Sequence, residues 1–132
     1  PVGWPGRQFG GDIGLTRVTA SLRDLARRRR PFTAEFLVDT GAIDCMAPKQ
    51  RLLAAGIKPE GRAVYELANG RTEEYEYGFA RISFMGEETV AQVVFGPSDV
   101  EPLLGVAALE NVGITVDPAR KTLERLPAKP LK

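Results

Sequence analysis

The chain has 132 residues, 43% hydrophobic and 27% charged, which is the composition of one globular domain of ordinary size. Eighteen basic residues against seventeen acidic ones give a net charge of +1, which does not indicate a nucleic-acid-binding surface. No apolar stretch is long enough to span a membrane. We therefore expect neither a nucleic-acid partner nor a membrane contact, and the lack of a targeting segment favours the cytoplasm.

Two residue types limit the chemistry that is open to the chain. The single cysteine, Cys45, excludes an intramolecular disulfide and a four-thiolate zinc site, and we expect it to be a small packing residue. The absence of histidine excludes Ser-His and Cys-His catalysis and histidine-ligated metals. Acid–base chemistry is left mainly to carboxylates, lysines and tyrosines, and we expect no metal and no other cofactor.

The chain is predicted to begin with an irregular arm over 1–14, which is rich in glycine. Alternating residues over 15–22 predict a strand, and 32–38 predicts a second strand antiparallel to it. The basic run Arg27–Arg30 between the two strands is interpreted as a solvated loop, with a contact to RNA or another anion as the alternative.

The middle of the chain predicts a helix and two hairpins. Residues 47–56 favour a short helix, because Pro48 suits its first turn and Gly56 its C-terminal end. An Asn-Gly pair, the strongest short signal for a hairpin, marks the first hairpin. The hairpin strands are predicted at 63–67 and 72–77, joined by 68–71, and at 79–84 and 89–95, joined by 85–88.

The last third of the chain continues the pattern of short elements. We expect a strand at 102–104, a helix at 106–111 that ends at a glycine, a hairpin over 114–126 and a tail at 127–132. Because most of the chain is short strands separated by turns, the predicted fold is mainly β. It is a small closed or partly closed barrel with one or two short helices.

One acidic residue stands out from this pattern. Asp39 follows the apolar residues Phe36, Leu37 and Val38, and a buried carboxylate is costly unless it is paired or neutralised. The sequence Asp-Thr-Gly at 39–41 is short, but its context adds weight. It stands within FLVDTGAIDCMAP, and it is followed by ELANGRTEEYEY and then by VVFGPSDVEPLLGVAALENVGITVDP.

In order and spacing, these three segments resemble the retropepsin-like aspartic proteases, the family of retroviral proteases and their bacterial relatives. The first segment is similar to the family's active-site strand and loop, the second to its flap hairpin, and the third to its C-terminal half. The resemblance covers about residues 15–126, which we take as one domain. It implies a small closed barrel with a flap hairpin that is active as a homodimer.

The resemblance also implies roles for individual residues. The catalytic loop would be Asp39, Thr40 and Gly41, with Thr40 bracing the two loops across the dimer. The loop would be supported from beneath by Leu103, Leu104 and Gly105. The residues implied in binding a peptide substrate are Ala42, Asp44 and the flap tip Ala68, Asn69, Gly70 and Arg71.

A hydrolase that activates water with carboxylates needs one to accept a proton and one to donate a proton. This chain has one good Asp-Thr-Gly, since Asp12-Ile13-Gly14 lies in the glycine-rich arm without an apolar strand before it. The second carboxylate is therefore expected to be Asp39 of a second copy, related by a two-fold axis. The predicted function is an aspartic endopeptidase that acts on a polypeptide as a homodimer.

The sequence departs from the family's pattern in two places. Ile43 stands where retroviral members often carry an acid, and the flap tip has a single glycine, Gly70, where many retroviral flaps have several. For Asp44, a solvated loop acid is the alternative to a peptide contact. These departures motivate the alternative function, a catalytically weak or inactive retropepsin-like module that dimerises and binds peptides.

Overall fold

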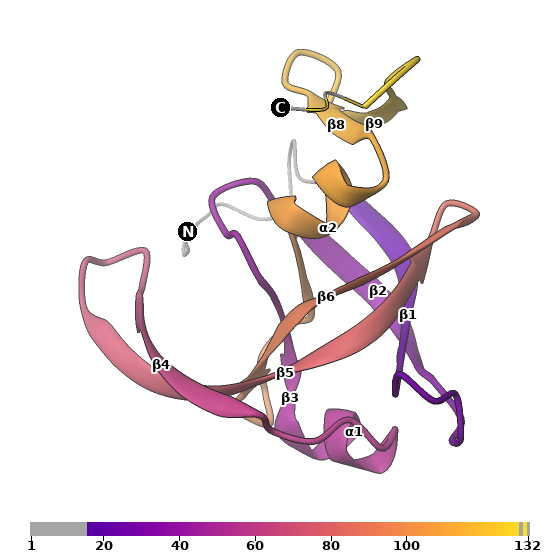
Figure 1. The fold of residues 1–132 in the computed structure, drawn as a ribbon. Coiled ribbons are helices and arrows are strands. Elements are labelled where there is room, and N and C mark those ends of the chain that lie inside the picture. The colour runs from indigo at the N-terminus through magenta and orange to yellow at the C-terminus, as the bar shows by residue number, and fades with distance from the viewer. Residues whose placement is uncertain (1–15, 130, 132) are drawn as a thin grey trace.

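The computed structural model describes residues 16–129 and residue 131, and its main feature is a closed β-barrel. Strands of the main sheet follow the order β1-β2-β7-β3-β6-β5-β4, and β1 also pairs with β5. Over the described residues, six strands therefore close into a ring, and β4 is added outside it on β5 (Figure 1). The strands are β1 (Arg17–Arg23), β2 (Phe32–Asp39), β3 (Cys45–Pro48), β4 (Gly61–Glu66), β5 (Thr72–Phe84), β6 (Glu87–Gly96), β7 (Leu103–Gly105), β8 (Ile114–Asp117) and β9 (Thr122–Arg125).

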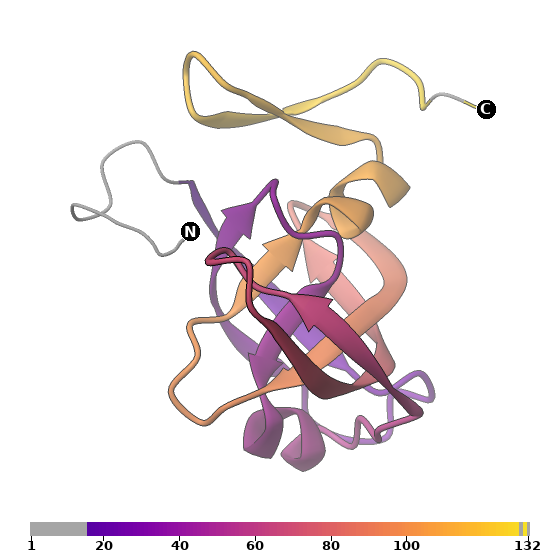
Figure 2. The same cartoon turned by 90° about the vertical axis from the view of Figure 1, so that its left-hand side faces the viewer.

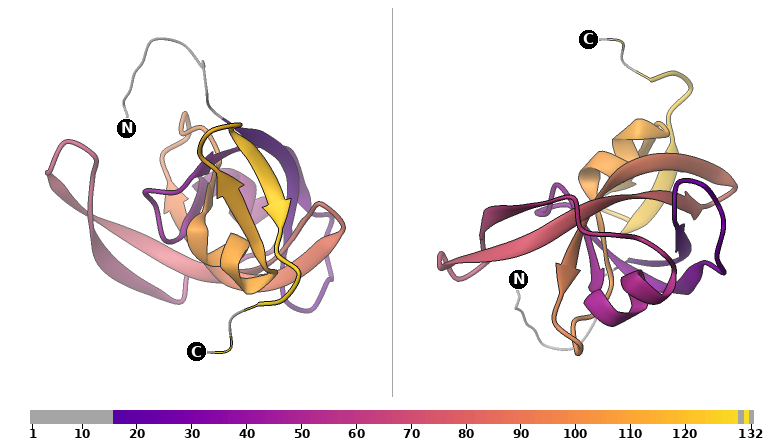
Figure 3. Two further views of the ribbon diagram at one scale, coloured as in Figure 1. Left: turned by 90° about the horizontal axis from the view of Figure 1, so that it is seen from above. Right: turned by 60° about the horizontal axis from the view of Figure 1, so that its bottom comes forward.

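Two short helices lie at opposite ends of the barrel, α1 (Lys49–Ala54) and α2 (Val106–Asn111) (Figure 1). The β8–β9 hairpin forms a separate two-stranded sheet, and it lies over α2 when the molecule is seen from above (Figure 3). Within the described chain, neither helix is long and apolar enough to cross a membrane. The predicted fold class, a small closed barrel with one or two short helices, is confirmed.

Strand β2, between β1 and β7 in the barrel wall, is buried near its end. Phe36, Leu37 and Val38 are all buried, although consecutive side chains of a strand point to opposite faces. Both faces of β2 are therefore covered near its end. Phe36 and Val38 belong to the main core, whereas Leu37 pairs with Leu103 of the neighbouring strand β7. The antiparallel pairing of β1 with β2 is confirmed.

The two hairpins predicted in the middle of the chain share one long strand. The segments 72–77 and 79–84 form the continuous strand β5, which begins in the first hairpin and continues as a strand of the barrel wall. Gly78 does not interrupt β5, since it pairs with Val93 of β6, and a Cβ there would lie 2.5 Å from the carbonyl oxygen of Lys58. The glycine thus allows the backbone of Lys58 to come close to β5. Residues 61–77 form a hairpin beyond the barrel, which we call the flap hairpin (Figure 2).

Most element boundaries differ from the prediction by one or two residues, and three differences have a clear physical reason. The turn after β5 is only Met85 and Gly86, both with positive φ (52° and 76°). Glu87 and Glu88 already belong to β6 and pair with β5. Strand β3 was not predicted, because four residues between a loop and a helix are too few to show a period. The helix predicted from residue 47 starts at Lys49, since the two preceding residues pair with β6. The predicted arm 1–14, Asp12 included, lies outside the described residues.

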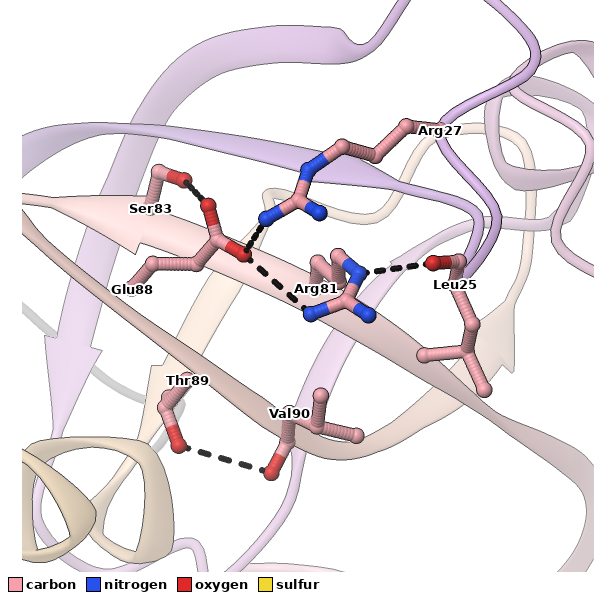
Figure 4. A network of polar contacts seen from close by, with 7 residues as sticks. All are labelled: Leu25, Arg27, Arg81, Ser83, Glu88, Thr89 and Val90. Carbon is pink, nitrogen blue, oxygen red and sulfur yellow. Dashed lines mark hydrogen bonds and ion pairs between the residues drawn. The ribbon is translucent and has the colours of Figure 1, made fainter.

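The basic run Arg27–Arg30 is exposed in the loop between β1 and β2, as predicted. Figure 4 shows how this loop is attached to the hairpin of β5 and β6. The Arg27 guanidinium lies 2.5 Å from the Glu88 carboxylate, and the Arg81 side chain donates to the carbonyl of Leu25 at 2.7 Å. Arg81 also lies 3.4 Å from Glu88, so that one carboxylate receives two cations.

Asp24 holds the same loop from within. It is buried, and its carboxylate accepts hydrogen bonds from the backbone amides of Arg28 and Arg29 and from the Arg28 side chain. Burial acts to raise the pKa of Asp24, but these hydrogen bonds outweigh it, and the pKa lies below its usual value. Asp24 therefore stabilises the loop while it is ionised, and this contribution is lost as the pH falls through its lowered pKa.

Two adjacent leucines on α1 test where the core ends. Leu52 is fully buried, whereas Leu53 is 41% exposed. We expect Leu52→Ala to lower the free energy of unfolding by about 2–5 kcal/mol, because it leaves a cavity in the core. Leu53→Ala should lower it by less than about 1 kcal/mol. Urea denaturation of both variants measures the difference, and equal losses would contradict the packing described for α1.

Candidate active site

The candidate catalytic loop begins where β2 ends. From here on, this name covers residues 39–44, which run from the end of β2 to the start of β3. Asp39 is half-buried, and one oxygen of its carboxylate, Oδ1, accepts a hydrogen bond of 2.9 Å from the amide of Gly41. The carbonyl of Asp39 accepts a second bond from the amide of Ala42 at 3.1 Å, which closes the turn. A Cβ at Gly41 would lie 3.3 Å from Oδ1 and would crowd the carboxylate. The loop therefore orients the Asp39 side chain through its own backbone.

Strand β7 lies parallel to the last residues of β2. The register places Leu104 opposite Val38 and Gly105 opposite Asp39, although the two segments are far apart in the sequence. The side chain of Leu104 is fully buried. The predicted support residues thus lie directly beside the strand that carries the carboxylate.

The chain after β7 also binds the catalytic loop. The first two residues of α2, Val106 and Ala107, donate their amides to the carbonyls of Ala42 (2.8 Å) and Ile43 (3.1 Å). The first amides of a helix have no partner within the helix, so the loop satisfies donors that would otherwise be unpaired. Gly105 makes this contact possible, since a Cβ there would lie 2.4 Å from the carbonyl oxygen of Asp44.

A cavity of about 810 Å³ lies between the catalytic loop and the flap hairpin. Its walls come from the loop after β2, from β3 and β7 beneath, and from β4, β5 and β6. The predicted site residues that line it are Asp39, Gly41, Ala42, Asp44, Ala68 and Leu103. Four of the other predicted residues do not line the cavity, namely the exposed Thr40 and the flap-tip residues Asn69, Gly70 and Arg71. The remaining two, Leu104 and Gly105, are buried and do not line it either.

The tip of the flap hairpin is a compact turn. The amide of Leu67 donates to the carbonyl of Arg71 at 2.7 Å, and the amide of Gly70 donates to the carbonyl of Leu67 at 2.9 Å. The side chain of Asn69 accepts a bond from the amide of Arg71. Gly70 has a φ of +85°, with open space where a Cβ would lie, so backbone conformation is what favours glycine here. The tip is held by its own hydrogen bonds.

Asp44 belongs to a polar cluster that the sequence did not reveal. Its Oδ2 accepts hydrogen bonds from the hydroxyl of Tyr65 (3.2 Å) and from the side-chain amide of Gln92 (3.1 Å). Gln92 also donates to the Tyr65 hydroxyl at 3.2 Å. This Asp44 cluster (Asp44, Tyr65 and Gln92) joins the catalytic loop to the flap hairpin and to β6. No local sequence pattern marks Tyr65 or Gln92 as a partner of Asp44, because the alternating burial of β4 appears only in the structure.

Burial shifts the ionisation of this cluster and of the neighbouring thiol. Desolvation raises the pKa of Asp44, and the hydrogen bonds from Tyr65 and Gln92 offset part of that rise. Burial also raises the pKa of Cys45 to about 11, against a lowering by the Gly105 amide, which donates to the sulfur at 3.4 Å. Cys45 is therefore a buried neutral thiol beneath the loop, as its predicted packing role requires.

Among the residues that the structure describes, no group of three or more carboxylates and thiols is placed to hold a metal ion. A family model described as aspartyl protease matches residues 13–108, which include the catalytic loop, the flap hairpin and β7. The chain belongs to the aspartyl protease family. No curated protein sequence matches it.

A solved structure extends the assignment of the family to the fold. The chain is similar to the protease of simian foamy virus (mac), known from a solution structure, with a TM-score of 0.51 and 16% sequence identity. The match covers 71% of this chain and 91% of the viral chain. At this identity the likeness shows the fold alone, which is that of the retropepsin-like aspartic proteases.

Removing only the hydroxyl of Tyr65 should change the pKa of Asp44 and leave the aromatic ring in the cavity wall. We expect Tyr65→Phe to raise the pKa of Asp44 further, because it removes a hydrogen bond that favours the charged carboxylate. Carbon-detected NMR titration of the Asp44 carboxyl measures the shift. Tyr75→Phe is the matched control, since the Tyr75 hydroxyl donates to Glu73 and not to Asp44. An Asp44 pKa that stays unchanged in Tyr65→Phe would contradict the role of this bond.

Gly105 should be intolerant of even one added carbon atom. In Gly105→Ala the new Cβ would meet the backbone of Asp44 and Ile43, which no side-chain rotation can relieve. We expect the free energy of unfolding to fall by about 1–3 kcal/mol, the usual effect of overpacking. Urea denaturation measures the loss, and amide NMR signals of residues 42–44 should shift with it. Wild-type stability would show that the loop is held less tightly than described.

Proposed function

We propose that the chain is an aspartic endopeptidase in which two Asp39 carboxylates, one from each subunit of a homodimer, activate a water molecule. The observation that carries the proposal is the position of Asp39, on an ordered loop at the end of a buried strand and on the wall of a cavity of about 810 Å³. Membership of the aspartyl protease family supports the reaction class.

The need for a second subunit follows from the chemistry. Hydrolysis of an amide requires a base to take a proton from water and an acid to protonate the substrate, and one carboxyl group cannot do both at once. Two close carboxylates share a single proton because both cannot ionise, as is known for aspartic proteases. Each chain offers one Asp-Thr-Gly, at Asp39, so the pair is assembled across a two-fold axis.

The other predicted residues have supporting roles in this proposal, within a domain that spans residues 15–126. Thr40, exposed beside Asp39, would brace the two loops across the dimer, and Gly41 would present its carbonyl to the substrate. Leu103, Leu104 and Gly105 hold the loop in place. An extended peptide would lie in the cavity, hydrogen-bonded along its backbone, and would contact Ala42, Asp44 and the flap tip of Ala68, Asn69, Gly70 and Arg71.

Replacing Asp39 tests the catalytic role directly. We expect Asp39→Asn to lower the rate of hydrolysis of an unstructured protein about 100-fold or more, because it removes the acid–base group. Wild-type activity should be highest at acidic pH, because the pair must retain one proton. Asp99→Asn, in an exposed loop outside the cavity, is the matched control and should keep wild-type activity. Full activity of Asp39→Asn in folded protein would refute the proposal.

Mixing the two proteins tests whether the site is shared. If subunits exchange freely, an equal mixture of wild type and Asp39→Asn keeps about a quarter of the dimers with two Asp39 residues. Activity would then fall to about a quarter of that of wild type at the same total concentration. Activity near one half would show that each chain acts alone. A confirmed wild-type dimer that binds peptide but cleaves none between about pH 3 and 7 would favour the peptide-binding module.

A further inference from the structure

The charge of the cavity is one-sided. Three carboxylates line it, Asp39 and Asp44 from the loop side and Glu66 from β4, and no lysine or arginine is among its lining residues. Two basic residues of the adjacent hairpin and helix are engaged with other carboxylates. Arg62 pairs with Glu74 and Glu76, and Lys49 pairs with Glu76 at 2.8 Å. A ligand in this cavity therefore meets negative charge that no basic residue among the lining residues neutralises.

Asp44 is the carboxylate that is best placed to use this imbalance. Both of its recorded hydrogen bonds end on Oδ2, which fixes the orientation of the carboxylate and leaves Oδ1 with no recorded donor among the described residues. The same part of the chain provides no cation within ion-pair distance of Asp44, although the residue is half-buried. A partly desolvated carboxylate without a cation is unfavourable, and a bound cation would compensate for it.

The other two carboxylates are less suited to select a ligand. Asp39 is assigned to the reaction itself, and Glu66 is exposed on β4, where solvent screens its charge. The wall of the same cavity includes the apolar side chains of Met46, Val64 and Val94. Such walls suit the methylene stem of a long basic side chain whose charged end reaches the carboxylate.

We propose that Asp44 determines substrate specificity, by binding a lysine or arginine side chain of the peptide in the subsite that Asp44, Tyr65 and Gln92 build beside the catalytic loop. This inference rests on the proposed peptidase function and adds the class of substrate to it. Tyr65 and Gln92 act through Asp44 as positioning residues. The apolar walls alone would instead favour an uncharged side chain. The two expectations therefore differ in whether a peptide with a basic or with an uncharged side chain is preferred.

A matched pair of peptides provides that measurement. In a set of otherwise identical peptides, one position at a time near the cleaved bond carries either lysine or norleucine, which has the same carbon stem without the charge. At one position we expect wild-type kcat/KM to favour lysine by about tenfold or more. In Asp44→Asn, an isosteric change that can still accept from Tyr65, this ratio should fall to about one, whatever the absolute rate. The control Asp99→Asn should keep the wild-type ratio.

The outcomes separate this inference from the proposed function. Cleavage without a preference for lysine at any position, or a preference that survives in Asp44→Asn, overturns the role of Asp44 and leaves the peptidase standing. If no peptide is cleaved, the proposed function fails, and the same peptides are titrated against the wild-type protein by calorimetry. Tighter binding of a lysine peptide that is lost in Asp44→Asn would then support the subsite, and equal binding of both peptides would overturn it.

Discussion

The site depends on one contact, the parallel pairing of β2 with β7 that sets Asp39 beside Gly105. Because β7 leads directly into α2, the same pairing brings two unpaired helix amides to the carbonyls of the catalytic loop. Gly105 is the point of closest approach, and no larger residue fits between the loop and the strand. The position of the catalytic loop is therefore a property of two distant segments, although the Asp39 carboxylate is oriented locally by the Gly41 amide.

The flap hairpin is built into the barrel, and this limits how it can open. Strand β5 passes without a break from the hairpin into the ring, and Glu76 at the base of the hairpin pairs with Lys49 of α1. The Asp44 cluster adds a second connection, from the catalytic loop to Tyr65 of β4. The hairpin is thus fastened at its base and along β4, while its tip is held only by its own turn hydrogen bonds among the described residues.

Much of the architecture was predictable because its signals are local. Alternation and turn residues placed most of the strands, and the apolar run before Asp39 marked the buried strand that carries the carboxylate. Where the prediction differed, the cause was contact with distant residues. Gly78 separates two predicted strands, yet it lies in mid-strand, where it pairs with Val93 and where the backbone of Lys58 leaves no room for a side chain. Strand β3 exists because β6 and β7 lie on either side of it.

By itself, the sequence determined the family, the mainly β architecture and the residue that the proposed chemistry uses, since these depend on residue types at short spacings. Only the tertiary structure decided what surrounds that residue. Gln92 meets Asp44 across 48 positions of sequence, and Gly105 meets Cys45 across 60. Such contacts arise from the closure of the barrel, which brings strand ends together irrespective of their separation along the chain. The charge of the cavity has the same origin, because it is a sum over side chains that only the closed fold assembles.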